Sequence, residues 1–321
     1  MRKVLVIGTG GTISCIKGEN GLEPQLCVDK LIKEIVLPDG IQVCSEQLFC
    51  IDSTNMTPRH WEKLAQRIHE RYDEFDGFVI THGTDTMAYA AAALSVLIQN
   101  SRKPIVFTGS MEPMTAEYSD APRNLGDAIC FAAKDGAFGV CLVFNGFMFY
   151  GYDVHKCNSN DLFAFNCVNC GIRGLLNDKD GRLAFQGEYS GETRFYERLS
   201  DGVFLVKLIP GQRLCVPKNA RAVILESYGT GGIPDYLFDD VKALAESGVY
   251  LIIATQCEHG GTRLCEYAVG QTAANSIPII ETGELAIEYA VARAEWALAY
   301  SDNYGEFKEL FYKTYREVNT P

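Results

Sequence analysis

The sequence predicts an α/β protein of two domains: a larger N-terminal domain around a mostly parallel, doubly wound sheet, and a smaller C-terminal α/β domain. Short β-rich runs alternate with helical patterns in both halves, which is typical of a parallel sheet covered by helices on both faces. The length of 321 residues suits two domains at roughly 150 residues each. Because a polar, glycine-bearing stretch interrupts the pattern, we place the N-terminal domain at 1–185, a linker at 186–201 and the C-terminal domain at 202–321.

Four short apolar segments of the N-terminal half are expected to be strands. Between the first two, Thr57 caps a helix that Pro58 opens, and apolar residues recur at helical spacing from Trp61 to Ile68. The apolar stretch Met87–Ile98 is expected to be a buried helix, since a bilayer span needs about 18 to 20 residues. The expected strands are Val4–Ile7, Phe78–Thr81, Pro104–Phe107 and Val140–Val143.

The C-terminal half repeats this alternation on a smaller scale. A helix is expected around Tyr236–Ser247, and a long helical region after Glu284. The strands expected here are Val203–Leu208, Ala222–Leu225 and Val249–Ala254.

Composition and charge exclude several classes of protein. Lysine and arginine number 29 against 41 acidic residues, which gives a net charge of −12 spread along the chain. Proteins that track phosphate groups are basic on one face, so no nucleic-acid partner is expected. The first apolar run ends at Gly8 and is too short for the core of a signal peptide. No membrane partner is expected either.

The twelve cysteines lie mostly singly inside apolar segments. Cys167-Val168-Asn169-Cys170 lacks the second pair that a zinc ribbon needs, so no metal is expected. We expect reduced, buried thiols in a cytoplasmic protein. Examples are Cys44, Cys50, Cys130 and Cys141.

Two turns after expected strands carry polar side chains. Sites in doubly wound sheets form where loops leave the carboxyl ends of strands. In the first turn, Gly8–Ser14, the glycines allow a sharp bend and close approach of N–H groups to a ligand, and Thr12 supplies a hydroxyl. A nucleotide-phosphate loop is the alternative. Ile13 stands where the dinucleotide pattern needs glycine, and the lysine of the P-loop pattern is missing.

The second turn, Thr81–Thr86, places a hydroxyl, a carboxylate and an imidazole before an apolar helix. Thr84 or Asp85 could instead only cap that helix. His82 is expected to be structural, because the chain shows neither a G-x-S-x-G elbow nor H-E-x-x-H spacing. Lys156 follows an aromatic stretch, so it is either a partly desolvated base or a surface lysine.

These motifs resemble those of the bacterial-type L-asparaginase family. Thr9–Ile13 and Thr81–Met87 are similar to its two signature motifs, and Asp52–Pro58 looks like its cytoplasmic, type I branch. The resemblance continues in order along nearly the whole chain. Further matching segments are Gly109–Met111, Asp120–Leu125, Val154–Lys156, Ser227–Gly229 and Thr255–Cys257.

The resemblance implies an amidohydrolase that converts L-asparagine to L-aspartate and ammonia without metal or cofactor. Thr12 would be the nucleophile of an acyl-enzyme intermediate, and Thr84 a second hydroxyl linked to Lys156 and Asp85. A threonine hydroxyl attacks only when a nearby base takes its proton, which is the function expected of Lys156.

Substrate binding and assembly are implied in the same way. Ser53, and Thr54 beside it, would hold the α-carboxylate of the substrate, while Asp85 would pair with the α-ammonium. A zwitterion needs opposite partners at its two ends. The resemblance further implies a homodimer or homotetramer and a cytoplasmic location.

Two other functions stay open. The same catalytic domain serves as the ammonia-generating subunit of a transfer-RNA-dependent amidotransferase, which carries an extra domain before its first strand. Here the first strand is expected to begin at Lys3, and the acidity suits transfer RNA poorly. The other alternative is a non-catalytic amino-acid sensor, although binding alone has no use for two hydroxyls and a lysine base.

Two positions depart from the family pattern. Many relatives carry a tyrosine in a mobile loop that bonds the nucleophilic threonine, but this sequence has Leu22 there and no tyrosine from Met1 to Cys50. Gly232 stands where relatives often place an asparagine that reaches a neighbouring subunit's substrate. These departures predict a weaker asparaginase with little glutaminase activity. The alternative is that another loop side chain, such as Lys17 or Glu19, or an ordered water takes over the contact and the kinetics are ordinary for the family.

Overall fold

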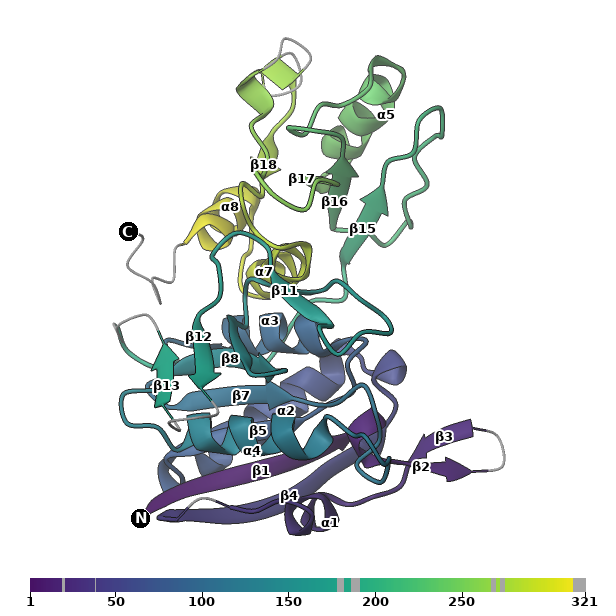
Figure 1. The fold of residues 1–321 in the computed structure, drawn as a ribbon. Helices are drawn as coiled ribbons and strands as arrows, with labels where there is room; N and C mark the ends of the chain where they lie inside the picture. The colour runs from purple at the N-terminus through teal and green to yellow at the C-terminus, as the bar shows by residue number, and fades with distance from the viewer. Residues whose placement is uncertain are drawn as a thin grey trace. The chain divides into compact units, whose positions relative to one another are not determined.

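The computed structural model describes residues 1–18, 21–37, 39–177, 182–185, 191–266, 270–271 and 275–313. The chain divides into two compact units, one running from Met1 to Glu197 and the other beginning at Arg198. Each unit has its own sheet and helices, so the predicted α/β fold class is confirmed (Figure 1). Within the expected linker, residues 186–190 lie outside the described residues.

The first unit contains an eight-stranded sheet in the order β13-β12-β9-β8-β7-β5-β1-β4. The run from β8 to β4 is parallel throughout, and β9, β12 and β13 extend the sheet with antiparallel pairs. The mostly parallel sheet is therefore as predicted. The strands are β1 (Arg2–Gly10), β4 (Ile41–Ile51), β5 (Gly77–Thr81), β7 (Pro104–Thr108), β8 (Gly139–Phe144), β9 (Phe147–Tyr150), β12 (Gly174–Asn177) and β13 (Arg182–Phe185).

Helices cover both faces of this sheet. On one face, α1 (Val28–Lys33) and α4 (Ala121–Ala132) pack on alternate strand residues such as Val79 and Val106. Helix α3 (Met87–Leu97), buried at ten of its eleven residues, contacts β7 and β8, and α2 (Pro58–Arg71) packs on α3. The apolar face predicted for α2 is the buried one, and Thr57 caps the helix.

Smaller elements complete the first unit. Strands β2 (Cys15–Gly18) and β3 (Gly21–Pro24) form an antiparallel pair after β1. Strands β10 (Val154–Lys156) and β11 (Phe165–Cys167) form a second pair, and β6 (Ile98–Gln99) and β14 (Arg194–Phe195) a third. Short 3-10 helices are η1 (Thr12–Ser14), η2 (Ser53–Asn55) and η3 (Tyr72–Glu74).

The second unit is built on a parallel four-stranded sheet in the order β15-β16-β17-β18. Helix α5 packs on one face through Leu237 and Val241, and α7 contacts β15 and β16. The three strands and the helices expected here are present, with β18 in addition. The elements are β15 (Val203–Lys207), β16 (Ala222–Ser227), α5 (Asp235–Glu246), β17 (Tyr250–Thr255), η4 (Leu264–Glu266), β18 (Ile279–Glu281), α7 (Ile287–Ala299) and α8 (Tyr304–Tyr312).

The cysteines are free, as expected, but the expectation that they are buried is wrong for most of them. Cys141 lies in the central strand β8 and is fully buried. Cys44 is half-buried and Cys50 exposed, because β4 is the edge strand of the sheet; Cys130, on α4, is also only half-buried. Within the described ranges, no helix is long and apolar enough to cross a membrane.

Candidate active site

Three loops leave the carboxyl ends of adjacent parallel strands and meet at one edge of the first sheet. The loops follow β1, β4 and β5, which lie in the order β5-β1-β4. Gly10, at the end of β1, pairs with Ile51 of β4, and the preceding Gly8 pairs with Thr81 of β5. Open α/β sheets bind ligands at such an edge.

The three loops touch through their backbones. Gly11 has a φ of +80°, and a Cβ there would lie 2.2 Å from the backbone nitrogen of Gly83. A Cβ on Gly83 would lie 2.5 Å from the hydroxyl oxygen of Ser53. Glycine is therefore required on both sides of the contact. Because Thr12 follows Gly11 and Thr84 follows Gly83, the two predicted catalytic hydroxyls flank the point where the loops meet.

Thr12 is the first residue of η1 and is half-buried. The turn beneath it is fixed by Ser14, whose backbone N–H and hydroxyl both donate to the Gly11 carbonyl, at 3.0 and 2.8 Å. Gly11 in turn donates its N–H to the Ile51 carbonyl at 3.1 Å. The backbone around Thr12 is thus held from two sides while its side chain is partly accessible.

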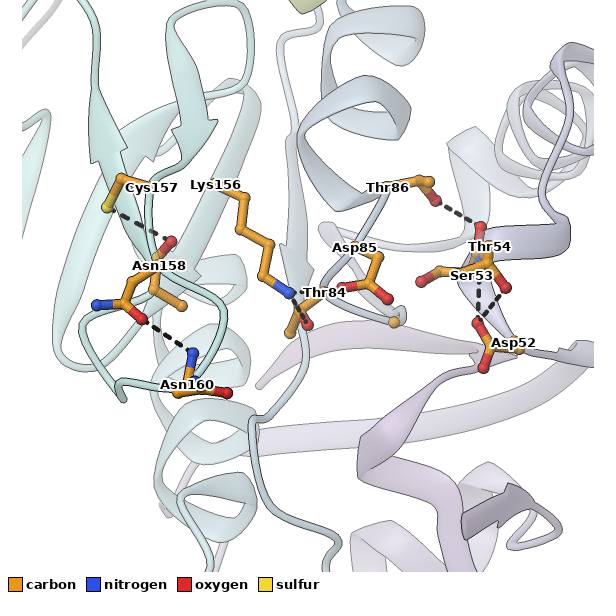
Figure 2. A network of polar contacts seen from close by, with 12 residues as sticks. Asp52, Ser53, Thr54, Thr84, Asp85, Thr86, Lys156, Cys157, Asn158 and Asn160 are labelled. Carbon is orange, nitrogen blue, oxygen red and sulfur yellow. Dashed lines mark hydrogen bonds and ion pairs between the residues drawn. The ribbon is translucent and has the colours of Figure 1, made fainter. Parts of the chain in front are cut away.

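Lys156 reaches from β10 to the loop after β5 (Figure 2). Its Nζ donates to Thr84 Oγ1 at 2.9 Å and to Asp85 Oδ1 at 2.6 Å. The Lys156 side chain is 16% exposed and that of Asp85 57% exposed, whereas Thr84 is buried. The ammonium therefore joins a buried hydroxyl to a carboxylate that remains open to solvent.

Neither Thr84 nor Asp85 occupies the cap position of the following helix. The N-cap of α3 is Thr86, and its side chain makes no capping bond. Instead the Thr86 hydroxyl donates to the Ser53 carbonyl at 2.8 Å, which ties the loops after β5 and β4 together.

The two residues predicted to hold the α-carboxylate differ in their surroundings. Ser53 is 3% exposed and lies against Gly83. Thr54 is exposed, and its N–H and hydroxyl both donate to Asp52 Oδ1 at 2.9 Å, as Figure 2 shows. Sequence reasoning gave Asp52 and Thr86 no function. The spacing Asp52-x-Thr54 is a signal for such a local turn.

His82 is completely buried and packs edge-on against the Phe107 ring. Burial lowers the pKa of its imidazole from 6.5 to about 4, so the ring is neutral near pH 7. A neutral ring can donate from Nδ1 to the Gly83 carbonyl, 2.8 Å away. The expectation of a structural histidine agrees with this environment.

The two departures from the family pattern lie in different units. Leu22 is on β3 opposite Lys17 and is 53% exposed. Gly232 forms an isolated bridge with Tyr228, and its carbonyl accepts a hydrogen bond from Ser227. In the part of the chain that the structure describes, no group of three or more histidine, cysteine and acidic side chains could hold a metal ion.

The burial of His82 predicts a loss of stability in acid. The unfolded chain takes up this proton as the pH falls below 6.5, whereas the folded protein does not until about pH 4. We expect this residue to cost about 3 kcal/mol of unfolding free energy between these pH values, at 1.36 kcal/mol per pKa unit. Denaturant unfolding of the wild type and of His82→Gln at several pH values checks this: their difference should shrink as the pH falls. A difference that is constant from pH 7 to pH 4 would contradict it.

Two family models match the chain in order. The model "Asparaginase, N-terminal" matches residues 3–188, and "Glutaminase/Asparaginase C-terminal domain" matches residues 203–311. Together they span most of the chain.

Individual relatives agree with this assignment. The L-asparaginase of Thermococcus kodakarensis is 33% identical, over 96% of each chain. The solved structure of the thermostable L-asparaginase from that organism superposes with a TM-score of 0.90, at 32% identity over 99% of this chain and 100% of that one. L-asparaginase 1 of Escherichia coli K12 is 30% identical, over 93% of this chain and 92% of the relative.

A relative with another function is also similar. One subunit of the Pyrococcus furiosus glutamyl-tRNA(Gln) amidotransferase is 30% identical, over 99% of this chain but 77% of that subunit. The two family models nevertheless match most of the chain and confirm the resemblance of the motifs. The chain belongs to the asparaginase family.

Proposed function

We propose that this chain hydrolyses the side-chain amide of L-asparagine to L-aspartate and ammonia. The observation that carries the proposal is the Lys156 ammonium bonded to Thr84 and Asp85, on a loop that contacts the Thr12 turn. Two hydroxyls, a lysine and an accessible carboxylate at one edge of the sheet support this chemistry. Relatives that bear the name L-asparaginase at 33% and 30% identity support the same activity.

Substrate recognition follows from the charges. Asp85 is exposed enough to receive the α-ammonium of asparagine, and a charge-assisted hydrogen bond would orient that end. Ser53, with its hydroxyl beside Gly83, offers a donor for the α-carboxylate. Thr54 is a second donor only if its hydroxyl leaves Asp52. The substrate would then lie with its side-chain amide directed toward the two threonines.

The reaction is acyl transfer in two steps. Thr12 Oγ attacks the amide carbonyl, forms an ester and expels the nitrogen, which leaves as ammonia. Water then cleaves the ester, giving aspartate and restoring the Thr12 hydroxyl. The proton that Thr12 loses balances the proton that the leaving nitrogen gains. Backbone N–H groups of the glycine turn would stabilise the oxyanion, an effect of about 2.7 to 4 kcal/mol per donor in other enzymes.

Lys156 and Thr84 would move these protons. In the free protein the Lys156 ammonium donates to both Thr84 and Asp85. A substrate α-ammonium bound at Asp85 would share that carboxylate and loosen its hold on Lys156. As the ammonium gives a proton to the leaving nitrogen, the Thr12 proton would pass through Thr84 to the same amine, so Lys156 ends the first step as an ammonium again. In the second step it would give a proton to Thr12 Oγ and receive one from the attacking water through Thr84. Substrate binding and proton transfer would thus be coupled through one carboxylate.

The assembly and location are proposed on separate grounds. A homodimer or homotetramer is what the family resemblance implies. The free cysteines support the cytoplasm, where thiols stay reduced.

The amidotransferase subunit is the alternative enzyme. The Thermococcus asparaginase is 33% identical to this chain and the amidotransferase subunit 30%, and further relatives that bear the name L-asparaginase support the first reading. An amino-acid sensor would bind asparagine and release no ammonia. One assay, ammonia release from asparagine without transfer RNA, distinguishes both alternatives from the proposal.

The test is ammonia release from L-asparagine by the protein alone, without transfer RNA. We expect turnover by the wild type, residual turnover by Thr12→Ser, which keeps a hydroxyl, and at least a hundredfold loss in Thr12→Ala. A single acid-base group commonly contributes a factor of about 10² to 10⁴, and loss of the nucleophile should cost no less. Asparagine binding without ammonia would favour the sensor. More than about a hundredth of wild-type activity in Thr12→Ala would show that another residue is the nucleophile.

Replacing Lys156 with methionine should remove turnover. Lys156→Met keeps the aliphatic stem but deletes the cation that holds Thr84 and Asp85. We expect kcat to fall by about 10² to 10⁴, the contribution of one acid-base group. Because Asp85 is largely exposed, the melting temperature should change little. The matched control is Lys63→Met on the exposed side of α2, which should keep the wild-type kcat. A near-normal kcat in Lys156→Met would remove Lys156 from the mechanism.

A further inference from the structure

A fourth loop, which follows β7, spans the two loops that carry the threonines. At one end, a Cβ on Gly109 would lie 2.3 Å from the His82 carbonyl oxygen, so its backbone is packed on the turn that precedes Thr84. At the other end, Met114 donates its N–H to the Ile13 carbonyl at 3.3 Å, one residue beyond Thr12. Residues 109–114, which we term the bridging loop, thus connect both sides of the proposed catalytic centre.

Asp120 and Asn124 hold the backbone of the bridging loop. The Asp120 carboxylate accepts the N–H of Met111 at 3.0 and 3.1 Å and that of Glu112 at 3.0 Å. Asn124 is completely buried, and its Nδ2 donates both to Asp120 Oδ2 and to the Gly109 carbonyl, each at 3.0 Å. Asp120, which precedes α4, and Asn124, in its first turn, therefore fix three backbone groups of the loop.

The Asp120 carboxylate does not cap the helix that it precedes. Asp120 is the N-cap residue of α4, a position where a carboxylate commonly accepts from the first N–H groups of the helix. It makes no such capping bond. The N–H of Ala121 bonds to the Ser119 hydroxyl instead, at 3.1 Å. The Asp120 oxygens accept hydrogen bonds from the bridging loop instead. The carboxylate therefore stabilises the loop and not the start of the helix.

We propose that Asp120, supported by Asn124, is a positioning residue that sets the separation of Thr12 and Thr84 through the bridging loop. The inference rests on the proposed function. A small error in the placement of reacting groups costs rate far more than binding. The groups proposed to hold the substrate ends have other supports: Thr86 bonds the Ser53 carbonyl, and Lys156 bonds Asp85. Loosening the bridging loop should therefore act on kcat and spare KM.

The first test is Asp120→Asn, which has the same shape but turns a donor NH₂ toward one of the loop N–H groups. We expect kcat for asparagine to fall at least tenfold with KM changed less than threefold. Hydrogen exchange at the Met111 and Glu112 amides should become faster. The matched control is Asn303→Ala, which removes a side-chain bond to a backbone N–H at the start of α8, where Asn303 accepts from Glu306 at 3.1 Å. It should lower the melting temperature and leave kcat within twofold.

A second variant, at Asn124, removes the other side chain that holds the bridging loop. Asn124→Ala removes the bonds to Asp120 and Gly109 and also the bond that its Oδ1 accepts from the Asn145 N–H at 2.9 Å. It should lower kcat with little change in KM, and the double variant should lose little more than the more impaired of the two single variants, because both loosen the bridging loop. If Asp120→Asn does not fold, Asn124→Ala decides alone. A kcat within twofold of the wild type, or an equal loss in the Asn303 control, would overturn the inference. Wild-type turnover is measured first, since its absence refutes the proposed function as well, whereas an active wild type with active variants refutes the positioning alone.

Discussion

The site depends on one steric constraint, the backbone contact between the loops that follow β1 and β5. Gly11 and Gly83 approach so closely that neither could carry a Cβ, and Ser53 lies against the same point. Parallel strands bring their carboxyl ends to one edge of the sheet, but side chains would keep the loops that follow them apart. Here the loops touch because both contact residues are glycines. The two threonines, each one residue further along, are placed by that contact.

An ion pair between Lys156 and Asp85 adds to the steric contact of the glycines. Lys156 comes from the β10 hairpin, which is outside the main sheet, and it meets a hydroxyl 72 residues earlier in the chain. An ion pair with a carboxylate as exposed as Asp85 stabilises a fold by little, of the order of 0 to 1 kcal/mol. The value of the pair lies in orientation: it points an ammonium at the Thr84 oxygen and leaves the carboxylate accessible. The bridging loop, held by Asp120, contacts residues close to both threonines in the chain.

Patterns with a strong local cause were visible in the sequence. Helix α2 has one apolar face and a cap, and α3 is apolar all round, so spacing alone predicts both. Strand β4 was not predicted, because the polar residues Gln42 and Ser45–Gln47 interrupt its apolar residues, as suits a half-buried strand at the edge of the sheet. The bond between Lys156 and Thr84 and the turn of Asp120 onto its loop arise from tertiary packing, and no local pattern encodes them. Motif resemblance indicated the candidate catalytic residues and the link of Thr84 to Lys156 and Asp85, whereas only the three-dimensional arrangement indicates how the loops that carry them are held.

The most direct measurement of the steric constraint is turnover in Gly11→Ala beside a control that shares the backbone strain. Gly136 has a φ of +77°, close to the +80° of Gly11, but no atom lies within 4 Å of a Cβ built there. Both alanines meet an unfavourable backbone conformation, and only the one at Gly11 also collides with the loop that carries Thr84. With asparagine as substrate, we expect Gly136→Ala to keep kcat within threefold of the wild type and Gly11→Ala to lose at least a hundredfold while remaining folded by circular dichroism. Turnover in Gly11→Ala equal to that in Gly136→Ala would contradict the claim that this contact positions the two threonines.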